Sequence, residues 1–173
     1  MPVTIRNFEP ADFETLWRID QECFPPGISY SRAELKFYIR RAGAFTLVAV
    51  NPEPGAIAAD PKLGQGRKII PPAPSAHPTI AAFIVSEDHR GSGHIITIDV
   101  VAAARRSGIG SLLLYAAEDR LRSLQCRSLE LETAVDNLSA LSFYKRHGYS
   151  VIKTHPRYYS NGADALVLEK QLA

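Results

Sequence analysis

The sequence has few of the features that mark secreted, membrane-spanning or nucleic-acid-binding proteins. Its 173 residues include only two cysteines, Cys23 and Cys126, which lie far apart along the chain. We expect two free thiols in a reduced compartment rather than a disulfide. The formal net charge is only +2, which gives no electrostatic argument for a nucleic-acid or membrane partner. No apolar run approaches the ~20 residues needed to cross a bilayer.

The opening residues, MPVTIRNFEPADF, carry charges where a secretory signal needs an apolar stretch, so we expect a cytoplasmic protein. A chain of 173 residues with 46% hydrophobic content fits a single domain, residues 1–173, with a core of ordinary size. The five histidines show no grouping typical of metal ligands. His89 and His94 flank a glycine turn, and we interpret them as surface or turn residues. We therefore expect no metal.

Residues 51–78 differ in composition from the rest of the chain. This stretch holds seven of the twelve prolines and three glycines, which favour neither a helix nor a strand. We interpret it as a Pro/Gly-rich surface insertion between two strands. A linker between two domains is the alternative, but the fifty residues before it contain too few strands to close a core.

Hydrophobic periodicity and turn residues predict a mixed α/β chain. The predicted strands are residues 3–8, 44–50, 79–89, 94–101, 128–135, 149–155 and 164–172, and the predicted helices are 10–24, 31–43, 108–124 and 137–148. Ser31 and Glu34 form a capping box at the second helix. The third helix places apolar residues on one face: Ile109, Leu112, Leu113, Ala116, Ala117, Leu121 and Leu124. This order predicts an α/β (α+β) fold with a mixed, mostly antiparallel sheet of about seven strands and four flanking helices.

Two glycines, Gly108 and Gly110, stand directly before the third helix, after Arg105 and Arg106. The first N–H groups of a helix have no partner within it, and the helix dipole adds partial positive charge there. Glycines would let a phosphate approach these amides, and either arginine could add a full charge. An equally simple interpretation is that the glycines only relieve a tight turn. The segment is neither a P-loop nor a G-x-G-x-x-G motif.

The same residues resemble a known family. Arg105-x-x-Gly108-x-Gly110, preceded by the strand HIITIDVV, resembles the acetyl-CoA signature Q/R-x-x-G-x-G/A of the GNAT N-acetyltransferases. The following stretch, LELETAVDNLSALSFYKRHGY, resembles their second signature of a strand, an Asn and a helix that ends F-Y-x-x-x-G-Y/F. Within the family, the nearest likeness is to the ribosomal-protein N-terminal alanine acetyltransferases and to related protein N-terminal acetyltransferases. The stretch RYYSNGADALVLEK resembles their C-terminal strand–loop–strand. The chain departs from the family at VAAAR, where Pro or an acidic residue is usual, and in its longer 51–78 segment.

The resemblance implies transfer of an acetyl group from acetyl-CoA to a primary amine, in particular the N-terminal α-amine of a protein. An α-amine has a pKa of about 8 and a lysine about 10.4, so the α-amine needs less help to lose its proton. The family position assigns Glu132 as general base, on the strand face opposite Leu131, with Glu130 as the rival on that face. It assigns Tyr144 as the general acid that protonates the leaving thiolate. From the residues alone, Glu132 also fits an ordinary solvated glutamate of a strand, and Tyr144 also fits an ordinary buried tyrosine of a helix.

The resemblance also implies two sets of binding residues. The CoA diphosphate would rest on amides of residues 106–111, and the Val100 N–H would polarise the thioester carbonyl. Asn137 would contact the cofactor or only cap its helix. The whole expected acetyl-CoA set is Ile98, Asp99, Val100, Arg105, Arg106, Ser107, Gly108, Ile109, Gly110, Ser111 and Asn137. The expected acceptor-binding residues, for a peptide or protein N-terminus, are Phe24, Pro25, Tyr30, Tyr158 and Tyr159.

Two other functions compete with this hypothesis. One is acetylation of a small-molecule amine or a lysine, which only a profile of acceptors separates from the first. The other is an acyl-CoA-sensing module without catalysis. The presence of both Glu132 and Tyr144 argues against the sensing module.

Overall fold

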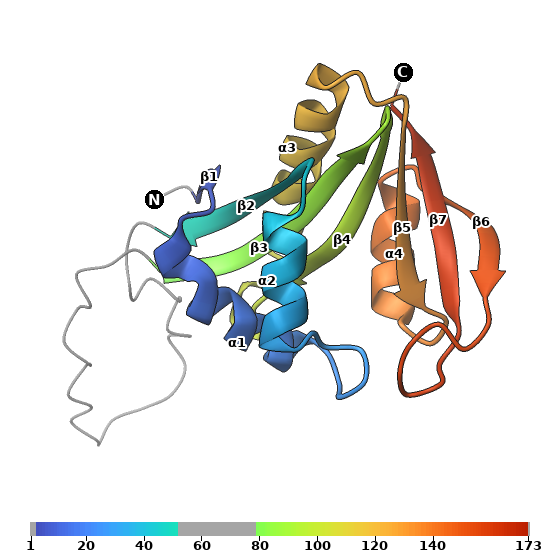
Figure 1. Cartoon of the computed structure of the whole chain (residues 1–173), viewed down its shortest axis with the longest axis horizontal. Coiled ribbons are helices and arrows are strands. Elements are labelled where there is room, and N and C mark those ends of the chain that lie inside the picture. Colours follow the sequence, from blue (N-terminus) through green and yellow to red (C-terminus); the bar gives the residue numbers. More distant parts are fainter. Residues whose placement is uncertain (1–2, 52–78, 173) are drawn as a thin grey trace, which may run out of the picture.

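A computed structural model describes residues 3–51 and 79–172, and these form a seven-stranded sheet with four α-helices (Figure 1). The elements in chain order are β1 (Thr4–Asn7), α1 (Phe13–Cys23), α2 (Arg32–Arg40), β2 (Ala44–Asn51), β3 (Thr79–His89), β4 (Ser92–Val100), α3 (Ile109–Ser123), β5 (Ser128–Ala134), α4 (Leu138–Arg146), β6 (Ser150–His155) and β7 (Ala165–Gln171). The predicted fold class is confirmed. The predicted insertion at 51–78 lies outside the described residues, apart from Asn51.

The strand order is β1-β2-β3-β4-β5-β7-β6, and every neighbouring pair is antiparallel except β4 with β5. That parallel pairing covers only Ser92–Ile95 against Ser128–Leu131. Beyond it the two strands diverge, so that β5, β7 and β6 stand apart from the first four strands (Figure 1). The sheet therefore opens in its middle, beside the second half of β4.

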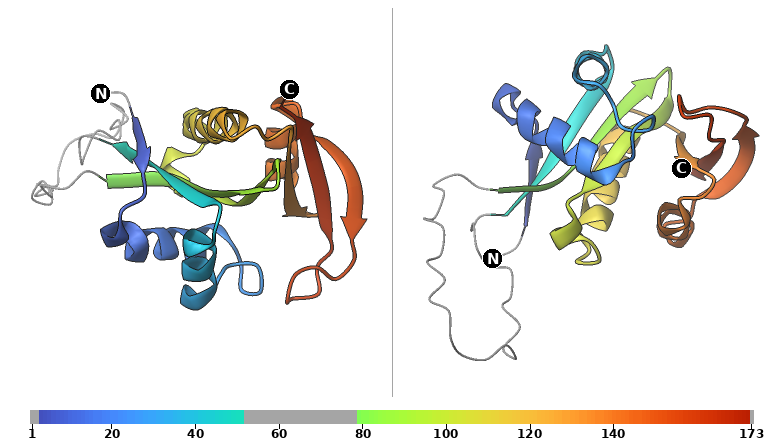
Figure 2. Two further views of the ribbon diagram at one scale, coloured as in Figure 1. Left: turned by 45° about the horizontal axis from the view of Figure 1, so that its top comes forward. Right: turned by 90° about the horizontal axis from the view of Figure 1, so that it is seen from below.

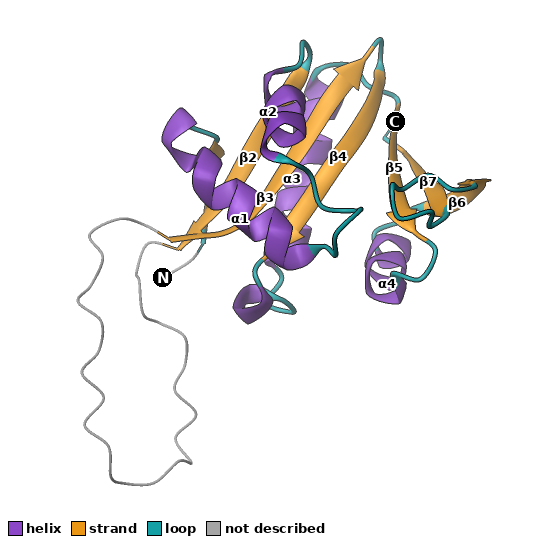
Figure 3. Ribbon diagram, turned by 60° about the horizontal axis from the view of Figure 1, so that its bottom comes forward, coloured by secondary structure: helices purple, strands orange, loops and turns teal. Residues whose placement is uncertain are grey.

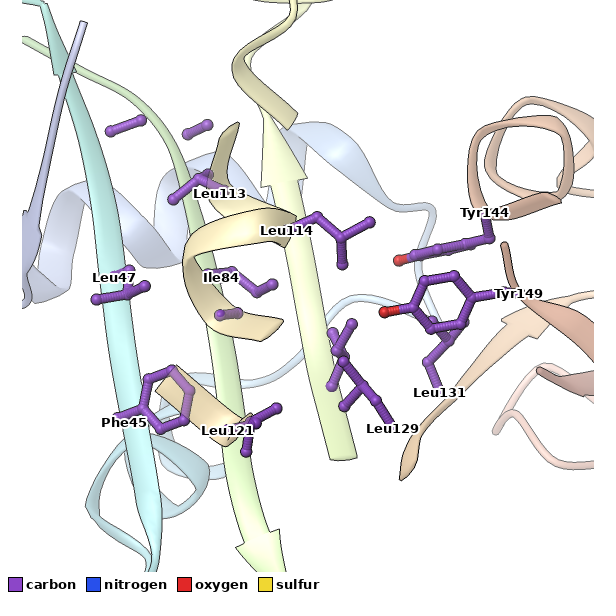
Figure 4. Packing of buried hydrophobic residues seen from close by; sticks show 14 of the residues in the cluster. Phe45, Leu47, Ile84, Leu113, Leu114, Leu121, Leu129, Leu131, Tyr144 and Tyr149 are labelled. Carbon is purple, nitrogen blue, oxygen red and sulfur yellow. The ribbon is translucent and has the colours of Figure 1, made fainter. Parts of the chain in front are cut away.

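The helices cover both faces of the sheet. Helices α1 and α2 lie on one face and α3 on the other (Figure 2; Figure 3). Each face has its own buried apolar cluster. The cluster under α3 and α4 includes Phe45, Leu47, Ile84, Leu113, Leu121 and Leu129 (Figure 4), and the cluster under α1 and α2 includes Leu16, Ile19, Leu35, Val48, Phe83 and Val85.

The predicted apolar face of α3 was partly wrong. Leu112 and Leu124 are 49% and 46% exposed, whereas Leu114, which the periodicity left out, is fully buried. Leu114 points from α3 toward Tyr144 of α4, across the opening between the two parts of the sheet (Figure 4). Helix α3 packs against α4 as well as against the sheet. Its buried face is therefore rotated toward α4, compared with the face that a helix packed on a sheet alone would bury.

A buried ionic network joins α3 to the far part of the sheet. Both carboxylate oxygens of Glu118, which is 1% exposed, accept hydrogen bonds from Nζ of Lys170 at 2.8 Å. The Tyr149 hydroxyl donates to Glu118 at 2.9 Å, and Arg122 donates from 3.2 Å. Lys170, which lies outside α3, therefore neutralises the Glu118 carboxylate, whose burial as an unpaired charge would destabilise the fold.

Local signals in the sequence explain several boundaries. The Glu34 N–H donates to Ser31 Oγ at 3.3 Å and the Ser31 N–H donates to Glu34 Oε2 at 2.8 Å, which confirms the predicted capping box. The Ala140 N–H donates to Asn137 Oδ1 at 3.1 Å, so Asn137 caps α4. Both cysteines are free. Across residues 3–51 and 79–172, none of the helices combines the length and apolar character that crossing a membrane requires.

Candidate active site

The opening beside β4 exposes backbone groups of that strand. The Val101 N–H donates to the carbonyl of Ala81 in β3. Because successive residues of a strand point their hydrogen-bonding groups in opposite directions, the Val100 N–H is directed to the side of β5. At this level β5 no longer pairs with β4. The amide predicted to polarise a thioester carbonyl thus faces the opening.

The turn from β4 into α3 leaves open space beside the first amides of the helix. Gly108 is the N-cap of α3 with φ +88°, no side chain caps it, and an added Cβ would meet nothing within 4 Å. Arg106 also has a positive φ, 62°, and is exposed. Ser107 turns its hydroxyl back to the Ala104 carbonyl at 2.6 Å. The first N–H groups of α3 therefore face open space, and this geometry fits a diphosphate as well as it fits a simple tight turn.

Arg105 points from the turn toward the end of β4 and the end of α1. Its Nε donates to the Val100 carbonyl at 3.0 Å, and its Nη2 lies 3.6 Å from Sγ of Cys23. The Cys23 thiol also donates to the Val100 carbonyl, at 3.4 Å. Arg105 thereby connects the C-terminal end of α1 to the end of β4, a position that motif spacing did not indicate.

Glu132 contacts a histidine. Its Oε2 lies 2.6 Å from Nε2 of His94, and the two side chains are 17% and 29% exposed. The other ring nitrogen of His94 lies 3.8 Å from Glu87 Oε1, and Glu87 is paired with Arg41 at 3.3 Å. The interpretation of His94 as a surface or turn residue was therefore wrong. The parallel β4–β5 pairing places His94 opposite Glu130, two residues before the predicted base on the neighbouring strand.

Opposing effects set the charge of His94. Burial alone would lower its pKa, but the hydrogen bond that the ring donates to Glu132 and the negative charges of Glu132, Glu87 and Glu130 raise its pKa overall. At a pH below the raised pKa of His94, Glu132 and His94 therefore form a carboxylate–imidazolium pair.

Tyr144 lies on the other wall of the opening. It is 5% exposed, and its ring packs against Phe143 and Tyr149 with centroid separations of 5.2 and 5.5 Å. The Tyr144 hydroxyl points toward β4 (Figure 4), whereas the Tyr149 hydroxyl donates to Glu118 of α3. Burial, followed by the charges of Asp99 and Tyr159, raises the pKa of Tyr144 above that of a free phenol. The phenol therefore keeps its proton at neutral pH and is able to donate it.

Asp99 is placed differently from the other predicted acetyl-CoA residues. Its side chain is 1% exposed, and Oδ1 accepts a hydrogen bond from the Thr97 hydroxyl at 2.8 Å. Burial, with the nearby charge of Asp20, raises its pKa well above that of a free carboxyl. Only the backbone of Asp99 is positioned to meet a ligand in the opening. Its neighbours Ile98 and Val100 are half-buried on the opposite face of the strand.

The loops that follow α1 and β6, which carry most of the residues predicted to bind the acceptor, touch each other. The Ser160 hydroxyl donates to the Gly27 carbonyl at 2.9 Å. A Cβ at Gly27, whose φ is +89°, would lie 2.8 Å from Cβ of Asn161, so the two loops touch where only glycine fits. Phe24 is half-buried and Pro25 is exposed in the first of these loops.

Aromatic residues gather near this contact. The Tyr30 ring lies 5.2 Å from that of Tyr38, and its hydroxyl donates to the Ile96 carbonyl at 3.3 Å. Tyr158 and Tyr159 are 5.0 Å apart, and burial raises the pKa of Tyr158 to about 12, with the charge of Glu132 adding to it. The structure thus brings Tyr158 and Tyr159 near Glu132. Tyr38 of α2 was missed because its place in an apolar helix stripe resembles that of an ordinary core residue.

The described residues contain no cluster of three or more His, Cys, Asp or Glu side chains that could hold a metal ion. The polar groups at the opening are the backbone amides of β4 and of the turn before α3, the Tyr144 hydroxyl, the Glu132 carboxylate and the His94 imidazole. This set suits acid–base chemistry and the binding of an anionic ligand.

Comparison with known proteins agrees with this geometry. Residues 13–149 match the model of the acetyltransferase (GNAT) family. N-alpha-acetyltransferase 30 of Schizosaccharomyces pombe is 40% identical over 90 residues, which make up 50% of this chain and 60% of that relative. The chain thus spans less than two thirds of the length of this relative.

Two solved structures share the fold over almost the whole chain. The ribosomal-protein-S18-alanine N-acetyltransferase from Escherichia coli has a TM-score of 0.72 at 20% identity, covering 99% of this chain and 95% of that one. A chain of the NatC complex bound to Gag peptide and CoA has a TM-score of 0.71 at 25% identity, covering 100% of both chains. The family match covers more than half of the sequence, and the chain belongs to the GNAT acetyltransferase family.

Proposed function

We propose that this protein is an acetyl-CoA-dependent N-acetyltransferase whose acceptor is the N-terminal α-amine of a protein or peptide. The observation that carries the choice of acceptor is the contact between Ser160 and Gly27, which joins the two loops on the acceptor side at 2.9 Å. The similarity to N-alpha-acetyltransferase 30, and to a NatC chain bound to Gag peptide and CoA, supports the same class of substrate.

The joined loops favour a chain end over an internal side chain. An N-terminal residue is the end of its chain, so it can enter a site that two touching loops cover. An internal lysine brings chain on both sides of it, and this chain has to pass where Gly27 and Asn161 are in contact. The lower pKa of an α-amine, about 8 compared with about 10.4 for lysine, favours the same acceptor.

Three groups around the opening have the chemistry that acetyl transfer requires. Glu132 accepts a proton from the attacking amine, and His94 at 2.6 Å holds the carboxylate in place. The Val100 N–H donates to the carbonyl oxygen as negative charge develops on it. Tyr144 donates its proton to the sulfur as the carbon–sulfur bond breaks. The products are an acetylated amine and a free thiol.

Acetyl-CoA supplies the acetyl group as a thioester whose thiolate is the leaving group. The turn at Arg106 to Ser111 offers free amides for its diphosphate, and Gly108 leaves the approach clear. Arg105 supports the end of β4, since its guanidinium bonds to the Val100 carbonyl at 3.0 Å. We place the protein in the cytoplasm, where the free thiols of Cys23 and Cys126 stay reduced.

The test is to incubate the purified protein with acetyl-CoA and a library of short peptides that differ in their first residues. Each peptide is made with a free N-terminus and no lysine, and again with an acetylated N-terminus and one lysine. CoA release and product mass are measured. Transfer to a subset of the free N-termini is the expected result.

Two outcomes would overturn this proposal. Transfer to the lysine peptides alone, or to small amines alone when these are added as further acceptors, would assign the protein to the competing class of acetyltransferases. Binding of acetyl-CoA without transfer to any amine would favour an acyl-CoA sensor.

A further inference from the structure

His147 joins the first turn of α3 to the C-terminal end of α4. Its Nδ1 lies 2.8 Å from the carbonyl oxygen of Phe143, and its Nε2 lies 2.9 Å from the hydroxyl of Ser111. The side chain is half-buried. No sequence motif singled out this histidine, and the chemistry proposed above does not use it.

The two partners fix where the protons lie. A carbonyl oxygen only accepts hydrogen bonds, so Nδ1 carries the proton and donates to Phe143. In the neutral ring, Nε2 then holds a lone pair, and the Ser111 hydroxyl donates to it. Both nitrogens of His147 are thereby committed to protein groups.

Aromatic neighbours hold the ring in this orientation. The centroid of Phe143 lies 4.4 Å and that of Tyr115 5.4 Å from the centroid of His147. Phe143 also packs against Gly110, where an added Cβ would lie 3.5 Å from the Phe143 ring. Two side chains near the end of α4 therefore contact two consecutive residues in the first turn of α3.

This contact leaves the amides of the turn open. The N–H groups of Ile109, Gly110 and Ser111 are the first of α3 and have no acceptor within the helix. A serine hydroxyl near a helix end commonly bonds to nearby backbone groups and changes their geometry. The bond to His147 holds the Ser111 hydroxyl away from that alternative.

We propose that His147 is a positioning residue for the diphosphate of CoA, acting through Ser111 on the first turn of α3. This inference rests on the proposed function, because it assumes that the turn binds CoA. Helix α4 also carries Tyr144, so His147 ties the turn that receives the diphosphate to the helix whose hydroxyl faces the sulfur. The His147–Ser111 bond then helps to set the distance between the two ends of the ligand site, together with the packing of Phe143 on Gly110.

The test compares four variants with the unmodified full chain. His147→Phe keeps the aromatic packing and loses both hydrogen bonds, whereas His147→Gln keeps an acceptor within reach of Ser111. Ser111→Ala removes the hydroxyl, and the fourth variant combines it with His147→Phe. Dissociation constants for CoA and dephospho-CoA, which both carry the diphosphate, are measured by calorimetry. Pantetheine, which lacks it, is titrated by NMR, and the Tm of each ligand-free variant is recorded.

The expected result is a dissociation constant about fivefold higher for both diphosphate ligands in His147→Phe and in Ser111→Ala. The double variant should be no weaker than either single one, because the same contact is lost. His147→Gln should restore most of the affinity, and pantetheine should bind all variants equally.

Each contrary result has a separate meaning. If the unmodified protein does not bind CoA, the proposed function itself fails. If it binds CoA and His147→Phe binds equally well, His147 has no positioning role. An equal loss for pantetheine and CoA would show a general loosening of α4 and would also overturn the inference.

Discussion

Nε2 of His94 lies 2.6 Å from Oε2 of Glu132, across the parallel pair of strands at which the sheet begins to open. On its other side, His94 faces Glu87, which pairs with the half-exposed Arg41. The predicted base is therefore the inner end of a chain of charged groups that runs from the opening toward solvent.

The first prediction concerns the pH dependence of stability. The pKa of His94 is raised in the folded protein, so its bond to Glu132 stabilises the fold fully below the pKa of an unfolded histidine, about 6.5. This contribution is lost as the pH rises through the raised pKa. We expect His94→Gln to lower the free energy of unfolding by about 1–2 kcal/mol at pH 6, and by less at pH 9. Urea unfolding at both pH values measures this.

His89→Gln provides the control for that experiment. His89 lies exposed at the end of β3. Its replacement should leave stability within about 0.5 kcal/mol at both pH values. Equal losses for His94→Gln at pH 6 and pH 9 would show that the bond does not depend on the charge of the imidazole.

The second prediction separates the two glutamates of β5. Glu132→Gln should lower kcat/KM about 100-fold near neutral pH, because an amide does not accept the proton of the amine. The difference in kcat/KM between this variant and the unmodified protein should become smaller above about pH 8, the approximate pKa of an α-amine, because the amine is then already deprotonated. Glu130→Gln, on the same face of the strand, should retain activity within about threefold. CoA release at pH 6.5 and 9 measures both variants, and the opposite ranking would make Glu130 the base.

The third prediction uses two buried tyrosines whose rings are 5.5 Å apart. Tyr144→Phe should lower kcat about 100-fold without unfolding the protein, because the ring remains and only the proton donor is lost. Tyr149→Phe removes a hydroxyl that bonds to Glu118 at 2.9 Å. It should lower the Tm while kcat stays within about twofold. Similar effects of both variants on kcat would count against a specific role for Tyr144.

The fourth prediction concerns the network around Glu118. Glu118→Ala leaves Lys170 without its carboxylate partner and should reduce the free energy of unfolding by about 3 kcal/mol. Glu14→Ala breaks an exposed ion pair with Arg32, in which both side chains are 56% exposed. That change should cost no more than about 0.5 kcal/mol. Chemical denaturation of the two variants makes the comparison, and equal losses would mean that burial of Glu118 adds nothing.

Local features of the fold were predictable because their signals lie within a few residues of one another. The capping box of Ser31 and Glu34 follows from residues three apart. The alternation in β5 placed Glu130 and Glu132 on the face opposite the buried Leu131. These patterns depend only on the periods of helix and strand.

Contacts between distant segments were not predictable in this way. The bond between His94 and Glu132 depends on the register of two parallel strands, which alternation within each strand does not specify. The exposure of Leu112 depends on α3 packing against α4 as well as the sheet. Arg105 is the first residue of the family motif, but its contact with Cys23 depends on where α1 ends.

The contact between Gly27 and Ser160 spans 133 residues of chain. A ribosome delivers Gly27 long before Ser160, so the bond that joins the two loops forms only after the chain has been translated beyond residue 160. A partly made chain that already has α1, α2 and the first four strands still lacks this bond. Translation of the segment around Ser160 therefore sets the earliest moment at which the two loops close over the proposed acceptor site.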